Sequence, residues 1–273
     1  MPASVVQGPG RAAGVGSMLR EWRTRRRRSQ MDLALDAGVS PRHLSFIETG
    51  RSRPSPSVLD AIAERLEVPL RERNRMLLAA GYAPRWRERA LAEDAAMAPV
   101  RAALQRLLGA HDPYPGLVLD RHWNVVLANR AADALIERLP ASLRNPCVNV
   151  FRASLHPQGM AAYTENFDAW AGYLLWSLRR ALATSADPAL EALQREVLAY
   201  PNVRAIRAAE TRDTASADGL LLPCVLRLGG TRLSMFTTLT TFGTPRDVII
   251  DELCIELFYP ADAETEAALR QPS

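Results

Sequence analysis

The chain has 273 residues, of which 48% are hydrophobic and 23% are charged, so it can form buried cores and is long enough for two domains. It has no run of about 18 apolar residues and no charged-then-apolar start, so we expect neither a membrane span nor a secretory signal. Three cysteines at no metal-ligand spacing, Cys147, Cys224 and Cys254, favour buried thiols in a reducing cytoplasm.

The charge is distributed unevenly along the chain. All 34 basic residues are arginine, and residues 1–90 contain 17 of them against 9 acidic residues. The remainder contains 17 arginines against 21 acidic residues, so the overall charge of +4 combines a basic N-terminal block with a slightly acidic body. This asymmetry is typical of a DNA-binding head joined to a domain that does not contact DNA.

Residues 1–15 are expected to form a flexible tail, and residues 16–82 are expected to form a domain of about five short helices. The first helix is predicted from about Ser17 to Arg28, and the fifth from about Leu70 to Ala80. Three serines stand where a hydroxyl can cap the start of a helix: Ser29, Ser40 and Ser55. Prolines follow the last two of these serines at the first helical position, where a missing N–H costs nothing.

The second and third helices are separated by Gly38-Val39, which is typical of a helix-turn-helix whose second helix can enter the major groove. At about 100° per residue, Leu44 and Ile47 define the inward side of the third helix. The opposite side carries an arginine, two hydroxyls and an aromatic ring: Arg42, Ser45, Phe46 and Thr49. These side chains can pair with guanine or pack on a thymine methyl, so they are the predicted base-reading set. The alternative is a helical domain that binds protein.

The stretch from Gln30 to Ser55 contains Leu33-Ala34, Ala37-Gly38-Val39-Ser40 and Ile47-Glu48, and it resembles the helix-turn-helix of the XRE family of phage repressors. The resemblance implies that Gln30 contacts a phosphate and that Glu48 bridges to an arginine of the first helix, such as Arg20 or Arg23. It also implies that Arg51 and Arg53 lie along the DNA backbone. The predicted DNA-binding residues are Gln30, Ser40, Arg42, Ser45, Phe46, Thr49, Arg51 and Arg53.

Residues 83–98 are expected to be a linker, and residues 99–270 a second domain. Helices are predicted at 99–110, from Asn129 to 139, at 162–182 and at 188–200, and strands at 117–120, up to 129, and at 220–228, 231–241 and 248–259. Gly229-Gly230 indicates a tight hairpin. Two strands, then helices, then three antiparallel strands is the order of a PAS-like domain. The expected fold class is therefore an all-α head followed by an α+β domain with a five-stranded antiparallel sheet.

Long motifs in both parts extend the resemblance over nearly all of residues 16–270. They include RHLSFIETGRSRP, PLRERNRMLLAAGYAP, DPYPGLVLDRHWNVVLANRAA, FRASLHPQG and TTFGTPRDVIIDELCIELFYPAD. With these motifs the chain resembles the MmyB-like transcription regulators. The resemblance implies an XRE DNA-binding domain followed by a PAS-like ligand-binding domain, with a fatty-acid-like molecule as the ligand.

A candidate pocket wall is the helix from about Ala162, where Tyr163, Phe167, Trp170 and Leu174 recur at helical spacing. The alternative is that this stripe is ordinary core. Asn129 and His156 lie near segment ends, where they could anchor a ligand head group. The alternative, which the sequence favours, is that Asn129 caps a helix and His156 is a turn residue.

The predicted function is that of a cytoplasmic transcription regulator that binds double-stranded DNA as a homodimer and responds to a small apolar ligand. In the alternative, the second domain serves only dimerisation or partner recruitment. An enzyme is not expected, because the four histidines form no HExxH motif and the chain has no GxSxG. We expect no metal, no cofactor apart from such a ligand, and no membrane partner.

Overall fold

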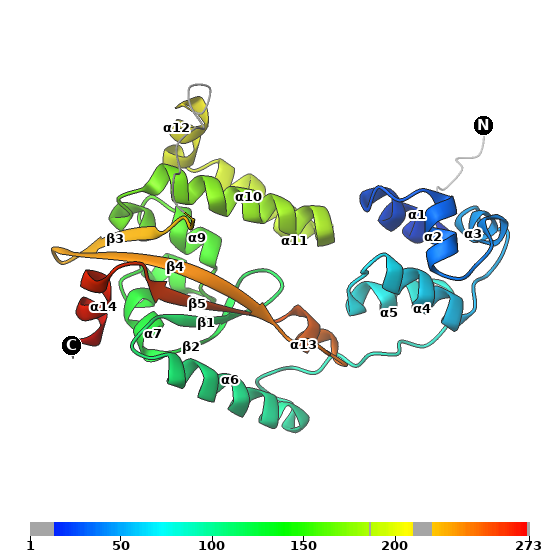
Figure 1. Ribbon diagram of the computed structural model, residues 1–273, viewed down its shortest axis with the longest axis horizontal. Coiled ribbons are helices and arrows are strands. Elements are labelled where there is room, and N and C mark those ends of the chain that lie inside the picture. The colour runs from blue at the N-terminus through cyan, green and yellow to red at the C-terminus, as the bar shows by residue number, and fades with distance from the viewer. Residues whose placement is uncertain (1–13, 186, 210–219, 272–273) are drawn as a thin grey trace, which may run out of the picture. The chain divides into compact units, whose positions relative to one another are not determined.

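The computed structural model describes residues 14–185, 187–209 and 220–271, which belong to two compact units (Figure 1). One unit consists of the described residues of 1–88 with 246–248, and the other of those of 89–245 with 249–273. The predicted tail at residues 1–15 lies outside the described residues except for its last two. No helix in the described part of the chain has the length and apolar character needed to cross a membrane.

The first unit contains five helices: α1 (Val15–Arg25), α2 (Gln30–Asp36), α3 (Pro41–Glu48), α4 (Pro56–Arg65) and α5 (Leu70–Ala79). The three predicted serine caps are confirmed, because the hydroxyls of Ser29, Ser40 and Ser55 accept the N–H groups of the residues three positions later. The first helix ends at Arg25 and not at Arg28, because Arg27 adopts a left-handed φ of 52° that stops the helix.

The core of this unit consists of side chains from all five helices, including Leu19, Leu33, Leu44, Leu59 and Met76, each no more than 1% exposed. Gly16 lies at the closest approach of α1 to α3. A Cβ added at Gly16 would lie 2.2 Å from the backbone oxygen of Ile47. A glycine here therefore lets α1 pack directly against the C-terminal end of α3.

The second unit is built on one antiparallel sheet of five strands in the order β2-β1-β5-β4-β3. The strands are β1 (Gly116–Leu119), β2 (Val125–Ala128), β3 (Cys224–Leu228), β4 (Thr231–Thr241) and β5 (Cys254–Pro260). The predicted hairpin is confirmed, because Gly229 and Gly230 join β3 to β4 with φ of 56° and 89°. The α+β fold class with five antiparallel strands is as predicted, and the strand order is consistent with a PAS-like domain.

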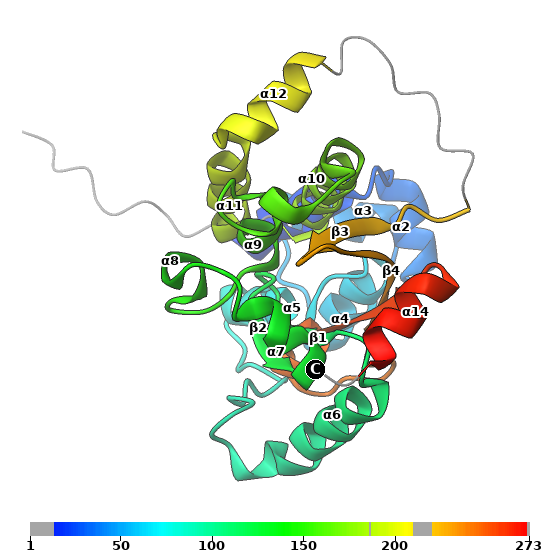
Figure 2. The ribbon, with the colours of Figure 1, turned by 90° about the vertical axis from the view of Figure 1, so that its left-hand side faces the viewer.

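Helices cover both faces of the sheet (Figure 2). One face packs on α6 (Ala98–His111), where Leu104 and Leu108 contact Val118 and Ile255. The other face packs against α7 (Arg130–Ile136), α9 (Val150–Leu155), α10 (Phe167–Ser185) and α11 (Pro188–Leu198). We did not predict α9. The other short helices that we did not predict are α8 (Ala141–Arg144), α12 (Pro201–Ala209), α13 (Val248–Glu252) and α14 (Ala263–Arg270).

The largest errors in the predicted element boundaries concern the last strand and the helix expected from Ala162. The last strand was expected from Val248, but residues 248–252 form α13 and β5 begins at Cys254. A single helical turn is too short for its period to be told from strand alternation. The helix expected from Ala162 is preceded by the 3-10 helix η2 (Met160–Tyr163) and starts only at Phe167, because the Asn166 side chain bonds the backbone of Pro223 and Val225 instead.

The remaining differences are smaller. The third strand was predicted from residue 220, but β3 starts at Cys224. The helix after Asn129 was predicted to reach residue 139, but α7 ends at Ile136. Of the three cysteines expected to be buried, Cys224 is buried, Cys254 is half-buried and Cys147 is exposed.

Candidate functional site

The helix α3 buries one side and exposes the other. Leu44 and Ile47 are completely buried, whereas Arg42 and Thr49 are exposed and Ser45 and Phe46 are half-buried. Helical periodicity thus places the predicted reading residues on the side of α3 that is open to a partner.

A buried carboxylate fixes the orientation of this helix. Glu48, the last residue of α3, accepts hydrogen bonds from Arg23 Nε at 2.7 Å and Arg23 Nη2 at 2.9 Å, in a bidentate pair with α1. It also accepts a hydrogen bond from Gln30 Nε2 at 2.6 Å. Burial by itself raises the pKa of Glu48, but the hydrogen bonds from Arg23 and Gln30 outweigh it and hold the pKa below the usual value.

Two arginines lie beside the Phe46 ring. The guanidinium carbon of Arg42 is 5.3 Å from the ring centroid, and that of Arg51 is 6.0 Å away, within the range of cation–π attraction. The backbone N–H of Arg51 also donates to the Phe46 carbonyl at 2.8 Å. Phe46 thus gathers two cationic side chains at the exposed side of α3.

The other predicted DNA-binding residues make contacts within the unit. Gln30 donates its amide to Glu48, and the Ser40 hydroxyl caps α3 by accepting the His43 N–H. The Thr49 hydroxyl donates to the Ser45 carbonyl at 2.8 Å. Arg53 donates to the Gly81 carbonyl at 3.0 Å, and its guanidinium carbon lies 4.2 Å from the Tyr82 ring centroid.

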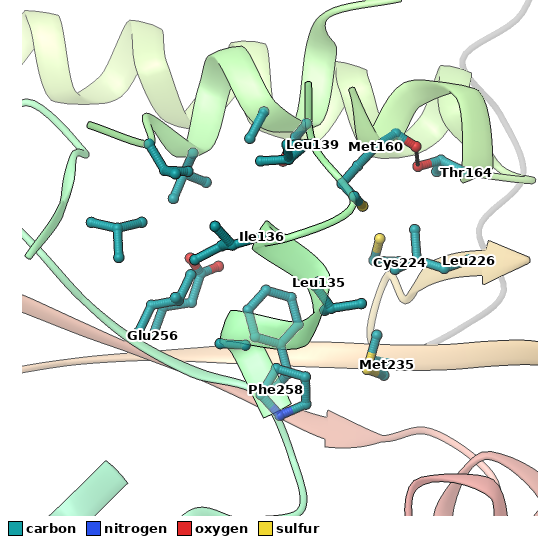
Figure 3. Close-up of a pocket in the computed structure, with 18 of the residues that line it drawn as sticks. Leu135, Ile136, Leu139, Met160, Thr164, Cys224, Leu226, Met235, Glu256 and Phe258 are labelled. Atoms are coloured by element: carbon teal, nitrogen blue, oxygen red, sulfur yellow. Dashed lines mark hydrogen bonds between the residues drawn. The ribbon is translucent and has the colours of Figure 1, made fainter. Parts of the chain in front are cut away.

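The second unit contains an apolar cavity of about 90 Å³ between the sheet and its helices (Figure 3). The apolar part of its wall includes Leu117, Leu135, Ile136, Leu139, Trp170, Leu174, Met235 and Phe258. Oxygen-bearing side chains in the wall are Ser154, Thr164 and Glu256.

The structure brings only two of the six predicted ligand-binding residues to this cavity. Trp170 and Leu174 line it, whereas the described lining residues do not include Tyr163, Phe167, Asn129 or His156. Tyr163 is 37% exposed on η2, and Phe167 packs against the core beside the cavity.

Asn129 and His156 have structural contacts of the kind that the alternative interpretation described. The Asn129 side chain accepts the N–H groups of Gly116 at 2.9 Å and Ala132 at 3.0 Å, so it caps α7 and ties it to β1. The His156 ring meets the Tyr200 ring edge-on at 5.0 Å between centroids, and its Nδ1 accepts the Gln158 N–H.

Glu256 is the charged residue among the cavity residues that the sequence analysis missed. It lies on β5 and is 5% exposed, and its Oε2 has no hydrogen-bond partner among the described residues. Burial raises its pKa to about 7, although a hydrogen bond with the Thr237 side chain opposes this shift. The signal was present in the sequence, because Glu256 stands between Cys254 and Phe258 on a face of β5 that is otherwise without charge.

Comparison with known proteins identifies both units. A family model described as "MmyB-like transcription regulator ligand binding domain" matches residues 100–271, and one described as "Helix-turn-helix" matches residues 19–73. No curated protein matches the chain. Since the first match alone covers more than half of the sequence, the chain belongs to the family of MmyB-like transcription regulators, DNA-binding proteins that carry a ligand-binding domain.

Proposed function

We propose that this regulator recognises its operator through the exposed side of α3 and that a small apolar molecule in the cavity changes its affinity for DNA. The observation that carries the DNA-reading part is the pairing of Arg42 and Arg51 with the Phe46 ring on a helix that Glu48 holds in place. We further propose that it acts in the cytoplasm as a homodimer on an inverted repeat, because two-fold symmetric dimers match palindromic half-sites.

The contacts within the first unit support different roles for the arginines. Arg42 at the start of α3 can reach a base edge, and Phe46 can pack on a thymine methyl while its ring keeps Arg42 extended. Arg51 follows the helix and is suited to a phosphate contact, which positions the protein without reading sequence. Ser45 and Thr49 supply hydroxyls to the same surface. Arg53 and Gln30 are also proposed to lie near the backbone, with their internal bonds fixing their directions.

The cavity supports a ligand with a largely apolar body. A fatty-acid-like chain is compatible with the apolar wall, although about 90 Å³ holds only a short segment of such a chain without movement of the side chains. A tenfold change in DNA affinity requires about 1.4 kcal/mol of coupling, which is within the usual range for ligand-controlled proteins.

The DNA-reading proposal is tested by selecting preferred duplexes from a random pool with the full-length protein and measuring mobility shifts on them. Arg42→Ala should weaken binding to the preferred duplex by about 1–3 kcal/mol and relax its sequence preference. A matched control is Arg75→Ala on α5, where the exposed arginine pairs with Glu72. This variant should leave DNA binding unchanged. Equal loss in both variants would contradict a reading role for α3.

The ligand part is tested separately by mass spectrometry of the native protein as purified. A co-purifying small molecule whose addition changes the mobility shift supports the proposal. If no ligand is found and the protein is a dimer whose DNA binding is unaffected by apolar compounds, the second domain serves dimerisation alone.

A further inference from the structure

Glu256 places a carboxyl group inside the apolar cavity. Along β5, Ile255 packs against α6, whereas Cys254, Glu256 and Phe258 alternate with it and point to the opposite, cavity side of the sheet. Figure 3 shows the carboxyl group of Glu256 directed into the cavity near Ile136. From this position in the middle of the sheet, the Glu256 side chain is almost entirely buried.

The surroundings of this carboxyl do not offset its charge. None of the described residues that line the cavity is basic. The titratable groups close to Glu256 are the thiols of Cys224 and Cys254, whose pKa values are raised to about 12 and about 11 by burial and by the charge of Glu256, so both stay neutral. The Thr237 hydroxyl satisfies part of the carboxyl, and Oε2 remains without a partner among the described residues.

A buried carboxylate without a charged partner can form an ion pair with a cationic ligand. Burying an ion pair requires both charges to be taken out of water, each at a cost, and here the fold has already removed the carboxylate from water. A cation that enters the cavity gains the charge-assisted hydrogen bond without that part of the cost. A carboxylate ligand would instead meet a group of the same charge.

Resting on the proposed function of the cavity as a ligand site, we infer that its ligand is a small apolar amine whose protonated nitrogen donates a hydrogen bond to Oε2 of Glu256. The apolar wall then encloses the hydrocarbon part. The volume of about 90 Å³ is smaller than the roughly 150 Å³ cavity that is known to hold benzene. A cavity of this volume therefore takes a chain of about four carbons or the end of a longer one.

Butylamine, butanol and butyrate share one hydrocarbon chain and differ in the head group, so they test the inference directly. Their dissociation constants for the full-length protein are obtained from the ligand-concentration dependence of the thermal unfolding midpoint at pH 8. We expect butylamine to bind about tenfold more tightly than butanol, because a charged hydrogen bond exceeds a neutral one, and butyrate to bind most weakly.

The variant Glu256→Gln distinguishes the contribution of the carboxylate to binding from that of the apolar cavity wall. It should weaken butylamine binding about tenfold and leave butanol binding within about twofold, so butanol reports that the variant is folded with its cavity intact. Lowering the pH from 8 to 6 should weaken butylamine binding to the wild type, because a proton then competes for the carboxylate, and should have no such effect in the variant.

Three outcomes would overturn the inference. These are butyrate binding as tightly as butylamine, a preference for butylamine that survives Glu256→Gln, and no butylamine binding at concentrations at which butanol binds. The first two leave the proposed function standing, because a ligand still occupies the cavity. Failure of the proposed function is a separate result, namely operator affinity that stays the same whichever compound occupies the cavity.

Discussion

Gln30 Nε2 lies 2.6 Å from the carboxylate of Glu48 and donates to it, so the first residue of α2 is bonded to the last residue of α3. Arg23 of α1 donates two further hydrogen bonds to the same carboxylate. One buried acid thus connects three helices beneath the exposed side of α3. The position of the proposed reading residues therefore depends on a residue that is itself buried.

Replacing Glu48 by glutamine should destabilise the first unit by about 3 kcal/mol. The change leaves the Arg23 guanidinium, whose side chain is 14% exposed, without its carboxylate partner. Chemical denaturation, monitored by circular dichroism, measures the difference in the free energy of unfolding between the variant and the wild type. The matched control is Glu21→Gln, an exposed acid paired with Arg25 on the same helix as Arg23, which should change stability by at most about 0.5 kcal/mol.

The same pair predicts how the destabilisation depends on pH. The pKa of Glu48 is lowered in the folded protein, so the unfolded chain takes up a proton first as the pH falls. The stability contributed by Glu48 is therefore present above the usual carboxyl pKa and is lost as the pH falls through the lowered folded value. The difference in the free energy of unfolding between wild type and Glu48→Gln should therefore become smaller in acid. A difference that does not change with pH would show that the charge of Glu48 does not stabilise α3.

Arg51→Ala should weaken binding to all duplexes by a similar factor and reduce the slope of log affinity against log salt concentration by about one. The reason is that a phosphate contact releases counterions whatever the base sequence. Mobility shifts at several salt concentrations on a preferred and a scrambled duplex measure the slope.

Phe46→Leu keeps an apolar side chain but removes the ring beside Arg42 and Arg51. This variant should reduce the ratio of the affinity for the preferred duplex to that for the scrambled duplex. Identical behaviour of both variants would remove the distinction between reading and positioning.

Much of the first unit could be predicted from local signals. Ser29, Ser40 and Ser55 cap helices because a hydroxyl satisfies an N–H group of the first turn, and this depends only on nearby residues. The same holds in the second unit for the hairpin at Gly229-Gly230, where both residues adopt positive φ. The bridge from Glu48 to Arg23 is also as the resemblance implied, although the added bond from Gln30 was not anticipated.

The cavity could be predicted only in part, because its wall combines residues from strands and helices distant in sequence. Trp170 and Leu174 were identified from helical spacing, and both line the cavity. Tyr163 was expected on the same stripe, but the chain between η2 and α10 bonds to the start of β3 and interrupts the helical phase. Glu256 was missed because alternation identifies an inward face without telling whether a charge on it has a partner.

Gly16→Ala should destabilise the first unit by about 1–3 kcal/mol, which is the usual cost of adding a methyl group to a closely packed contact. The added Cβ would lie 2.2 Å from the Ile47 oxygen and 2.9 Å from the Glu48 oxygen, and both are backbone atoms that cannot rotate away. Helices α1 and α3 must therefore separate, and operator binding should weaken as well.

Gly109→Ala is the matched control for this substitution. Gly109 lies within α6, and a Cβ there would meet nothing within 4 Å. Alanine should stabilise that helix by up to about 1 kcal/mol, because it has the higher helix propensity. Chemical denaturation of both variants gives the change in the free energy of unfolding, which should be destabilising for Gly16→Ala and stabilising for Gly109→Ala. A stabilising effect of Gly16→Ala would contradict the close packing of α1 on α3.

Glu256→Gln should stabilise the protein at pH 8 and have little effect near pH 4.5. The folded-state pKa of about 7 lies above the usual value of 4.5, so between these values the folded state binds more protons than the unfolded chain, and its stability falls as the pH rises. Ionising Glu256 in its buried position costs about 3 kcal/mol once the pH is above 7, a cost that the neutral amide avoids.

Denaturation of wild type and Glu256→Gln at pH 4.5 and pH 8 measures this gain in the free energy of unfolding. Glu196→Gln is the control, because its effect on stability should have the opposite sign. The hydrogen bond from Arg152 lowers the pKa of Glu196 despite its partial burial, so removing this carboxylate should destabilise the protein more at pH 8 than in acid. A saturating amine should remove the advantage of Glu256→Gln at pH 8, because it gives the wild-type carboxylate the partner that it lacks. If Glu256→Gln is instead destabilising at pH 8, the carboxylate already has a stabilising partner and is not available to a ligand.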